Sequence, residues 1–219
     1  INDRAFYGCK SLEIFTCPEK LRYMGREVFR DSGIKVFNVN KNIDYMPLTI
    51  LRYCPCQQIN VHPDSFYYTS IDGVLYKQED YCDKKSDLSL YIYPNSKTNK
   101  EYTPPKNVSL IRSSSIIDNH FLEKINFPSS VKLIKYGIVS GCKNLKFIRI
   151  KSSNTEVEPG AFDGISLTTK ITCPYNYKYE NVLLDDKIKP ERDNELTVFI
   201  DNISTNIDKE VIVWLLLRI

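Results

Sequence analysis

The sequence predicts a repeat protein in which short, similar segments stack side by side into a solenoid. Three observations predict this fold class: a period of about 23 residues, a strand-like motif within each period, and a second apolar step before the next period begins. A segment of that length cannot bury its own apolar face, so neighbouring segments must share a core.

A pair of anchor residues sets the period. Six pairs share one phase at steps of 22 or 23 residues, apart from one long gap after the third, and we call these units repeats 1 to 6. The anchor pairs are Ala5-Phe6, Val28-Phe29, Ile50-Leu51, Ser115-Ile116, Ile138-Val139 and Ala161-Phe162. Three residues after each second anchor lies the post-anchor position, which is usually small or polar and often cysteine: Cys9, Ser32, Cys54, Asn119, Cys142 and Ile165.

Each repeat continues with the pattern L-x-x-I-x-I or a variant of it. Its last two apolar residues are two apart, which is the alternation of a strand with one buried face. The apolar triplets are Leu12/Phe15/Cys17, Ile34/Phe37/Val39, Cys56/Ile59/Val61, Leu122/Ile125/Phe127, Leu145/Ile148/Ile150 and Thr168/Ile171/Cys173. A second apolar step, as at Val131 and Ile134, then turns the chain across the convex side.

The gap between repeats 3 and 4 has the pattern of a β-hairpin. Residues 72–76 and 88–94 are strand-like, and the polar stretch 77–87 between them predicts a loop. Gly73 is expected where the backbone must turn or approach closely. We therefore expect a hairpin elaboration that need not interrupt the stack. The predicted organisation is repeats 1–3 in 1–64, the hairpin region in 65–104, repeats 4–6 in 105–176, and a C-terminal region in 177–219.

Composition limits the function classes. The 219 residues carry 30 basic and 27 acidic side chains, and a net charge of +3 gives no overall field that would indicate nucleic-acid binding. Seven cysteines are an odd number, so at least one thiol stays unpaired within the chain.

The motifs resemble the BspA-type leucine-rich repeats of surface proteins from oral bacteria and mucosal protist parasites, over about residues 1 to 176. The segments that carry the resemblance are 5–12, 71–76, 127–134 and 140–145. The resemblance implies a right-handed leucine-rich-repeat solenoid, α/β horseshoe-like, with a parallel sheet on its concave side and turns and short helices on its convex side. It also implies adhesion or surface recognition, at the cell surface or after secretion, with no catalytic residues.

The strand motif also predicts which side chains face a ligand. Residues on either side of the central apolar position point away from the core, onto the concave face. In repeats 1–3 these are Ile14, Thr16, Val36, Asn38, Gln58 and Asn60, an apolar-to-neutral set. In repeats 4–6 they are Lys124, Asn126, Phe147, Arg149, Lys170 and Thr172.

The second set lies partly in a basic stretch, because residues 124–151 contain seven basic residues and no acidic one. Our hypothesis is that Lys124, Arg149 and Lys170 form a cationic row that attracts an acidic partner, such as a sulfated glycan or an acidic protein surface. The alternative is that these are ordinary surface charges that keep the array soluble.

Other candidate sites have weaker support. Cys54-Pro55-Cys56 with His62 and Cys82 has zinc-ligand chemistry, but Cys54 falls on the post-anchor position and Cys56 on a strand position, which predicts buried structural thiols. Acidic residues near the hairpin loop could hold calcium, yet their spacing is not that of a known loop: Asp72, Asp80, Asp83 and Asp87. The two histidines, His62 and His120, offer little for acid–base catalysis. We therefore expect neither an enzyme nor a metal or other cofactor.

Beyond Pro174 the period stops. The apolar run 211–217 predicts a capping element, with the start of a membrane span as the alternative. Two functions remain: a surface or secreted module that binds a protein or glycan, and an intracellular leucine-rich-repeat scaffold or regulatory module.

Overall fold

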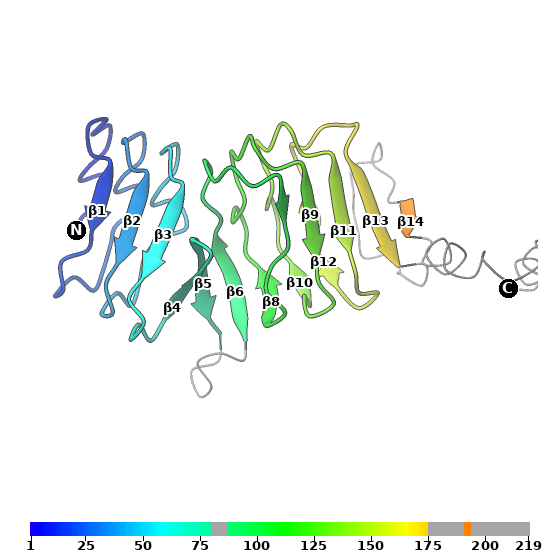
Figure 1. Ribbon diagram of the computed structural model, residues 1–219, viewed down its shortest axis with the longest axis horizontal. Coiled ribbons are helices and arrows are strands. Elements are labelled where there is room, and N and C mark those ends of the chain that lie inside the picture. The colour runs from blue at the N-terminus through cyan, green and yellow to red at the C-terminus, as the bar shows by residue number, and fades with distance from the viewer. Residues whose placement is uncertain (80–86, 175–190, 194–219) are drawn as a thin grey trace, which may run out of the picture.

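The motif strands stack in parallel, in the register that the period predicts. A computed structural model describes residues 1–79, 87–174 and 191–193, and shows the strands in sequence order from the N-terminal to the C-terminal end (Figure 1). The N-terminal sheet is β1 (Ile14–Thr16), β2 (Val36–Val39) and β3 (Gln58–Val61). The C-terminal sheet, in spatial order, is β7 (Glu101–Tyr102), β9 (Lys124–Phe127), β11 (Phe147–Ile150), β13 (Lys170–Pro174) and β14 (Glu191–Asp193).

The central apolar residues of the motif lie opposite one another from strand to strand. Phe37 pairs in register with Ile59, and Ile148 pairs with Ile125 on one side and Ile171 on the other. All five side chains are buried, whereas the motif residues beside Phe37 and Ile148 are only half-buried. The predicted alternation is therefore confirmed.

A third sheet runs along the other side of the solenoid. Its spatial order is β12 (Glu156–Val157), β10 (Leu133–Ile134), β8 (Val108–Ile111), β6 (Leu88–Ile92), β5 (Val74–Gln78) and β4 (Tyr68–Ile71). The second apolar step forms the short strands β8 and β10. The short helices expected on the convex side do not occur in the part of the chain that the structure describes. In repeats 4–6 the second extended step pairs as a strand with its neighbours, and that pairing takes the place of a helical turn.

The anchor residues lie in tight turns that form a second ladder between repeats. The Phe6 N–H donates to the Val28 carbonyl at 2.9 Å, the Phe29 N–H to Ile50 at 3.1 Å, and the Ile116 N–H to Ile138 at 2.8 Å. The turns use left-handed backbone, with φ of 59° at Asp31. We call this the anchor-turn ladder.

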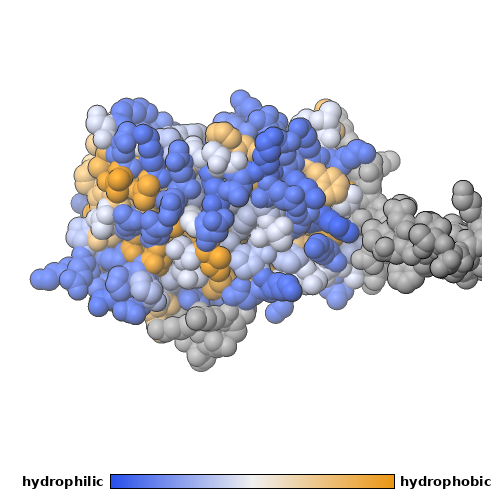
Figure 2. Space-filling model, in the orientation of Figure 1, coloured by the Kyte–Doolittle hydropathy of each residue, from blue (hydrophilic) through white to orange (hydrophobic). Residues whose placement is uncertain are grey.

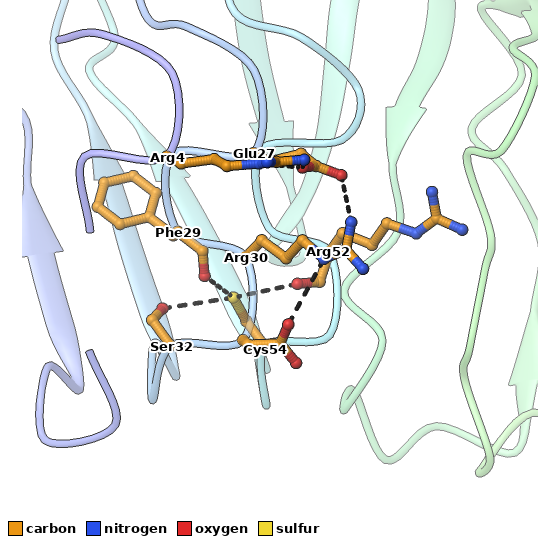
Figure 3. A network of polar contacts seen from close by, with 8 residues as sticks. Arg4, Glu27, Phe29, Arg30, Ser32, Arg52 and Cys54 are labelled. Carbon is orange, nitrogen blue, oxygen red and sulfur yellow. Dashed lines mark hydrogen bonds and ion pairs between the residues drawn. The ribbon is translucent and has the colours of Figure 1, made fainter. Parts of the chain in front are cut away.

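Post-anchor side chains close the space between successive anchor turns. The Cys54 thiol donates to the Phe29 carbonyl at 2.7 Å and lies 3.4 Å from the Ser32 hydroxyl (Figure 3). The Cys142 thiol donates to the Ile116 carbonyl at 3.2 Å, and burial raises its pKa to about 12. These buried cysteines are therefore protonated donors that link neighbouring repeats, as their positions in the period predict.

The hairpin is present, and it is larger than the sequence indicated. The predicted strands correspond to β5 and β6, which pair antiparallel, and β4 adds a further antiparallel partner to β5. Asp72 (φ 50°) and Gly73 (φ 71°) form the turn between β4 and β5, which places Gly73 at the predicted turn. Part of the predicted loop, residues 80–86, lies outside the described residues.

The hairpin interrupts the stack of motif strands. No strand of the N-terminal sheet pairs with the C-terminal sheet among the described residues; instead, the Ile59 N–H donates to the Gly73 carbonyl at 2.9 Å. The apolar interior is divided as well. One cluster contains Leu75, Tyr91 and Ile92 with residues of repeats 1–3, and the other contains Val74, Tyr76 and Leu90 with residues of repeats 4–6. The expectation of one continuous core is therefore wrong.

Tyrosines carry polar contacts into both clusters. The Tyr76 and Tyr102 hydroxyls lie 2.8 Å apart, and the Tyr91 hydroxyl donates to the Met46 carbonyl at 2.5 Å. Burial raises the pKa of Tyr76 to about 12. Tyr76 of β5 thus makes its hydroxyl contact in the C-terminal half of the protein, and Tyr91 of β6 makes its hydroxyl contact in the N-terminal half.

We predict that Tyr76→Phe lowers the free energy of unfolding by about 1–3 kcal/mol, because it leaves the buried Tyr102 hydroxyl without its partner. Denaturant unfolding measures this loss. The matched control is Tyr23→Phe, where the ring is half exposed and the change is expected to stay within about 0.5 kcal/mol. Equal effects of the two substitutions would contradict the role assigned to the tyrosine pair.

Candidate functional site

The candidate binding surface is the solvent side of the motif strands, which we call the strand face. Figure 2 shows apolar side chains gathered over the N-terminal strands β1 and β2, whereas the surface over β9 and β11 is mostly hydrophilic. The two halves of the strand face therefore differ in chemistry, as the sequence predicts.

In the N-terminal half, a ladder of neutral side chains crosses the three strands. The Asn38 amide donates to the Thr16 hydroxyl at 3.0 Å, and the Asn60 amide donates to Asn38 at 2.8 Å. These residues line an open groove of about 470 Å³. Their hydrogen-bonding groups are largely used within the ladder, so the groove presents few unused polar groups.

In the C-terminal half, the structure brings the six predicted residues into two neighbouring rows. Strand register places Lys124, Phe147 and Lys170 side by side in one row. Asn126, Arg149 and Thr172 form the second row, two residues further along the same strands. Adjacent strands lie about 4.8 Å apart, so a single ligand could contact neighbouring members of a row.

Glu101 was missed by the sequence reasoning, and it changes the charge of this surface. It lies on β7 in register with Lys124, whose ammonium is 3.3 Å from its carboxylate. The Asn126 amide also donates to Glu101 at 2.7 Å, and these two contacts, the Asn126 hydrogen bond foremost, lower the pKa of the Glu101 carboxyl. Lys124 further lies over the Phe147 ring, 5.7 Å from its centroid. The row therefore begins with an ion pair rather than with an isolated cation.

Carboxylates also pair with other parts of the basic stretch. Glu123 contacts Lys146 at 2.7 Å and Lys100 at 3.0 Å, and hydrogen bonds from these lysines lower the pKa of its carboxyl to about 2. Lys135 pairs with Glu158 at 3.1 Å. Glu123 and Glu158 lie outside residues 124–151 in the sequence, and the stacking of the repeats brings their carboxylates next to these lysines.

The remaining predicted residues of the strand face differ in exposure. Arg149 is half-buried, Lys170 is exposed, and Asn126 and Thr172 are buried. The Thr172 hydroxyl has no hydrogen-bond partner among the described residues. Arg149 and Lys170 supply the charge on the C-terminal side of Phe147.

The structure places some of the other candidate metal-site residues, and others lie outside the described residues. Cys54 and Cys56 are buried, and His62 is partly exposed with Asp64 3.9 Å away. Within residues 1–79 and 87–174, no group of three or more histidine, cysteine or acidic residues could hold a metal ion. Cys82, Asp80, Asp83 and the apolar run 211–217 lie outside the described residues. In the part that is described, no helix is long and apolar enough to cross a membrane.

Comparison with protein families identifies the repeats. The family described as the BspA type leucine rich repeat region matches in six copies, over residues 1–86 and 86–182. The chain belongs to this BspA-type leucine-rich-repeat family. A search of curated proteins gives no match.

Several solved structures resemble this chain at low sequence identity. A leucine rich cell surface protein from Faecalibacterium prausnitzii A2-165 is 17% identical with a TM-score of 0.57, over 95% of this chain and 66% of that one. The pneumococcal vaccine antigen PcpA is 18% identical with a TM-score of 0.50, over 94% of this chain and 68% of that one. A leucine-rich repeat protein from Eubacterium ventriosum ATCC 27560 is 22% identical with a TM-score of 0.48, over 78% of this chain. The chain spans only 56% of that protein's length.

The burial of the post-anchor and strand cysteines predicts a selective pattern of thiol labelling. In a Cys82→Ser background at about pH 8, a thiol reagent should modify exposed Cys9 rapidly. The five buried thiols should react only on unfolding, because desolvation raises the pKa of Cys17, Cys56 and Cys142 to about 12. Mass spectrometry of the labelled peptides measures the order. Native-state labelling of Cys54 or Cys142 as fast as that of Cys9 would contradict the hydrogen-bonded, buried positions.

Proposed function

We propose that the chain is a non-catalytic binding module that recognises a protein or glycan partner through the C-terminal half of the strand face. The contact residues are Lys124, Phe147 and Lys170 in one row and Asn126, Arg149 and Thr172 in the other. The observation that carries this proposal is the register, which aligns Lys124, Phe147 and Lys170 across β9, β11 and β13 and leaves Arg149 in the neighbouring row.

The charges indicate the kind of partner. Three basic residues on neighbouring strands favour a ligand that presents carboxylate or sulfate groups. Glu101 already pairs with Lys124, so a ligand anion must compete with that carboxylate for the Lys124 ammonium. Phe147 adds apolar area in the middle of the row, which suits a binding hot spot with a charged rim.

The proposed setting is the cell surface or the extracellular space, and the Faecalibacterium prausnitzii relative is described as a cell surface protein. A second candidate is an intracellular scaffold or regulatory module. One observation favours it: the six cysteines that the structure describes form no disulfide with one another. Binding through the strand face is common to both.

Charge reversal tests the proposed surface. We predict that Lys124→Glu, Arg149→Glu and Lys170→Glu together weaken binding to immobilised heparin, used as a sulfated probe, by about 10-fold or more. Binding of the unaltered chain should also fall as salt rises. A host-protein array with the same variant extends the test to acidic protein surfaces.

The matched control reverses three exposed lysines of the same basic stretch that lie off the two rows: Lys132, Lys143 and Lys151. It changes the net charge by the same amount and should retain most of the binding. Equal losses in the two triple variants would contradict a site on the strand face, as would an unaltered chain that binds no acidic ligand.

A further inference from the structure

A second surface of the protein has the features of a binding site, and it lies on the anchor turns rather than on the strand face. In repeats 1–3, charged side chains cover these turns. Glu27 pairs with Arg4 at 2.8 Å and with Arg30 at 2.6 Å, and Arg52 lies beside them (Figure 3). The residues before the anchors in repeats 4–6 are small instead, namely Ser114, Gly137 and Gly160. At Gly137 an added Cβ would meet no atom within 4 Å, so the surface there is open.

The anchor-turn ladder is broken where the two halves of the protein meet. Within repeats 1–3 and within repeats 4–6, each turn donates backbone hydrogen bonds to the next, but the turn of repeat 3 makes none to repeat 4 among the described residues. A cleft of about 320 Å³ lies at this break, at the low end of the roughly 300–1,000 Å³ typical of ligand pockets. We call it the junction cleft; Arg52 and Tyr53 line it from repeat 3, and Asp118, Tyr136 and Asp163 from repeats 4–6.

The junction cleft shares Arg52, Tyr53 and Asp118 with a smaller inner cavity of about 20 Å³. The inner cavity has room for about one water-sized group. Tyr93 and Ser115 line it, and they are only 2% and 1% exposed. Neither hydroxyl has a hydrogen-bond partner among the described residues, and the same holds for the side-chain amide oxygen of Asn95 and the Nε of Arg52, two further lining residues. Four residues lining one cavity that each carry an unpartnered buried polar atom are unusual, because buried polar groups are nearly always satisfied.

The outer part of the junction cleft combines charged groups with exposed aromatic rings. Asp118, Asp163 and Arg52 all line the cleft and make no ion pair among the described residues. Tyr53 is 44% exposed and Tyr136 is 56% exposed. The guanidinium groups of Arg30 and Arg52 lie over the Tyr53 ring, so Tyr136 supplies the uncovered aromatic surface. The cleft is therefore rich in acceptors, and its two carboxylates against one guanidinium do not favour an anion.

We propose that the junction cleft binds a neutral saccharide, with one ligand hydroxyl directed into the inner cavity. A sugar hydroxyl both donates and accepts, which matches the Ser115 hydroxyl, the Asn95 acceptor and the Arg52 donor. The carboxylates of Asp118 and Asp163 accept hydrogen bonds from further hydroxyls, and the apolar face of a sugar ring packs against Tyr136. This site is independent of the strand face proposed above.

Two other ligands fit the junction cleft less well. A sulfated chain would meet two unpaired carboxylates. An extended peptide would need a strand edge to pair with, but the turns that border the cleft have left-handed backbone at Tyr53 (φ 59°), Ser114 (φ 57°) and Asp118 (φ 54°). The unpartnered groups of the residues that line its inner cavity also include a hydroxyl, an amide oxygen and a guanidinium N–H, which suit a ligand hydroxyl.

Isothermal titration with neutral mono- and disaccharides built from glucose, galactose, mannose, fucose and N-acetylhexosamines tests the proposal. At least one should bind with a Kd of about 1 mM or tighter, and its affinity should be insensitive to salt. The double variant Asp118→Asn, Asp163→Asn should weaken that affinity by about 10-fold or more, because each lost carboxylate acceptor removes a charge-assisted hydrogen bond.

The matched control is Asp31→Asn, which changes the residue at the turn position of Asp118 in repeat 2, where the ladder is intact. It should leave the affinity unchanged within about 2-fold, as should reversal of Lys124, Arg149 and Lys170. A loss on that reversal would assign the sugar to the strand face and overturn the proposal. The proposal also fails if no neutral saccharide in the panel binds, if the Asp118/Asp163 variant binds normally, or if only heparin or peptides occupy the cleft.

Discussion

Burial of the hairpin on both faces is the constraint on which the rest of the structure depends. β5 is paired on one side with β4 and on the other with β6, and β6 is in turn paired with β8, so both strands are interior strands of their sheet. Alternate side chains of β5 enter different clusters, with Leu75 on the side of repeats 1–3 and Val74 and Tyr76 on the side of repeats 4–6. Neither half can bury its inner end without this pair of strands.

This arrangement explains why one chain carries two kinds of surface. The hairpin separates the motif strands into two parallel sheets, so the neutral ladder of Asn38 and Asn60 and the charged rows around Lys124 lie on different sheets. It also ends the anchor-turn ladder at repeat 3, because the chain that follows β3 goes into the hairpin before repeat 4 begins. The junction cleft lies at that break, and Tyr93, directly after β6, lines the inner cavity beside it.

Much of this fold could be predicted from the sequence, because its strongest signals are periodic. The anchors, the post-anchor cysteines and the inward residues of each motif strand recur at fixed spacing, and register follows once a parallel stack is assumed. The absence of helices from the described residues could not be predicted, because the period fits either a second strand or a short helix on the convex side. β7 is two residues long and has no motif, so its residue Glu101 could not be placed beside Lys124. The junction cleft and the inner cavity are lined by residues from 49–53, 93–95 and 114–118 among others, and no local pattern in the sequence predicts that these segments meet.

The central claim is that β5 and β6 are the shared interior of two half-arrays. Hydrogen–deuterium exchange read by mass spectrometry tests it most directly, since amides buried between two cores exchange only when both halves open. The account predicts that peptides covering β5 and β6 are protected at least as long as those covering β2 and β9. Exchange of β5 and β6 at the rate of the surface turns, while β2 and β9 stay protected, would show that the hairpin is a surface addition and would contradict the account.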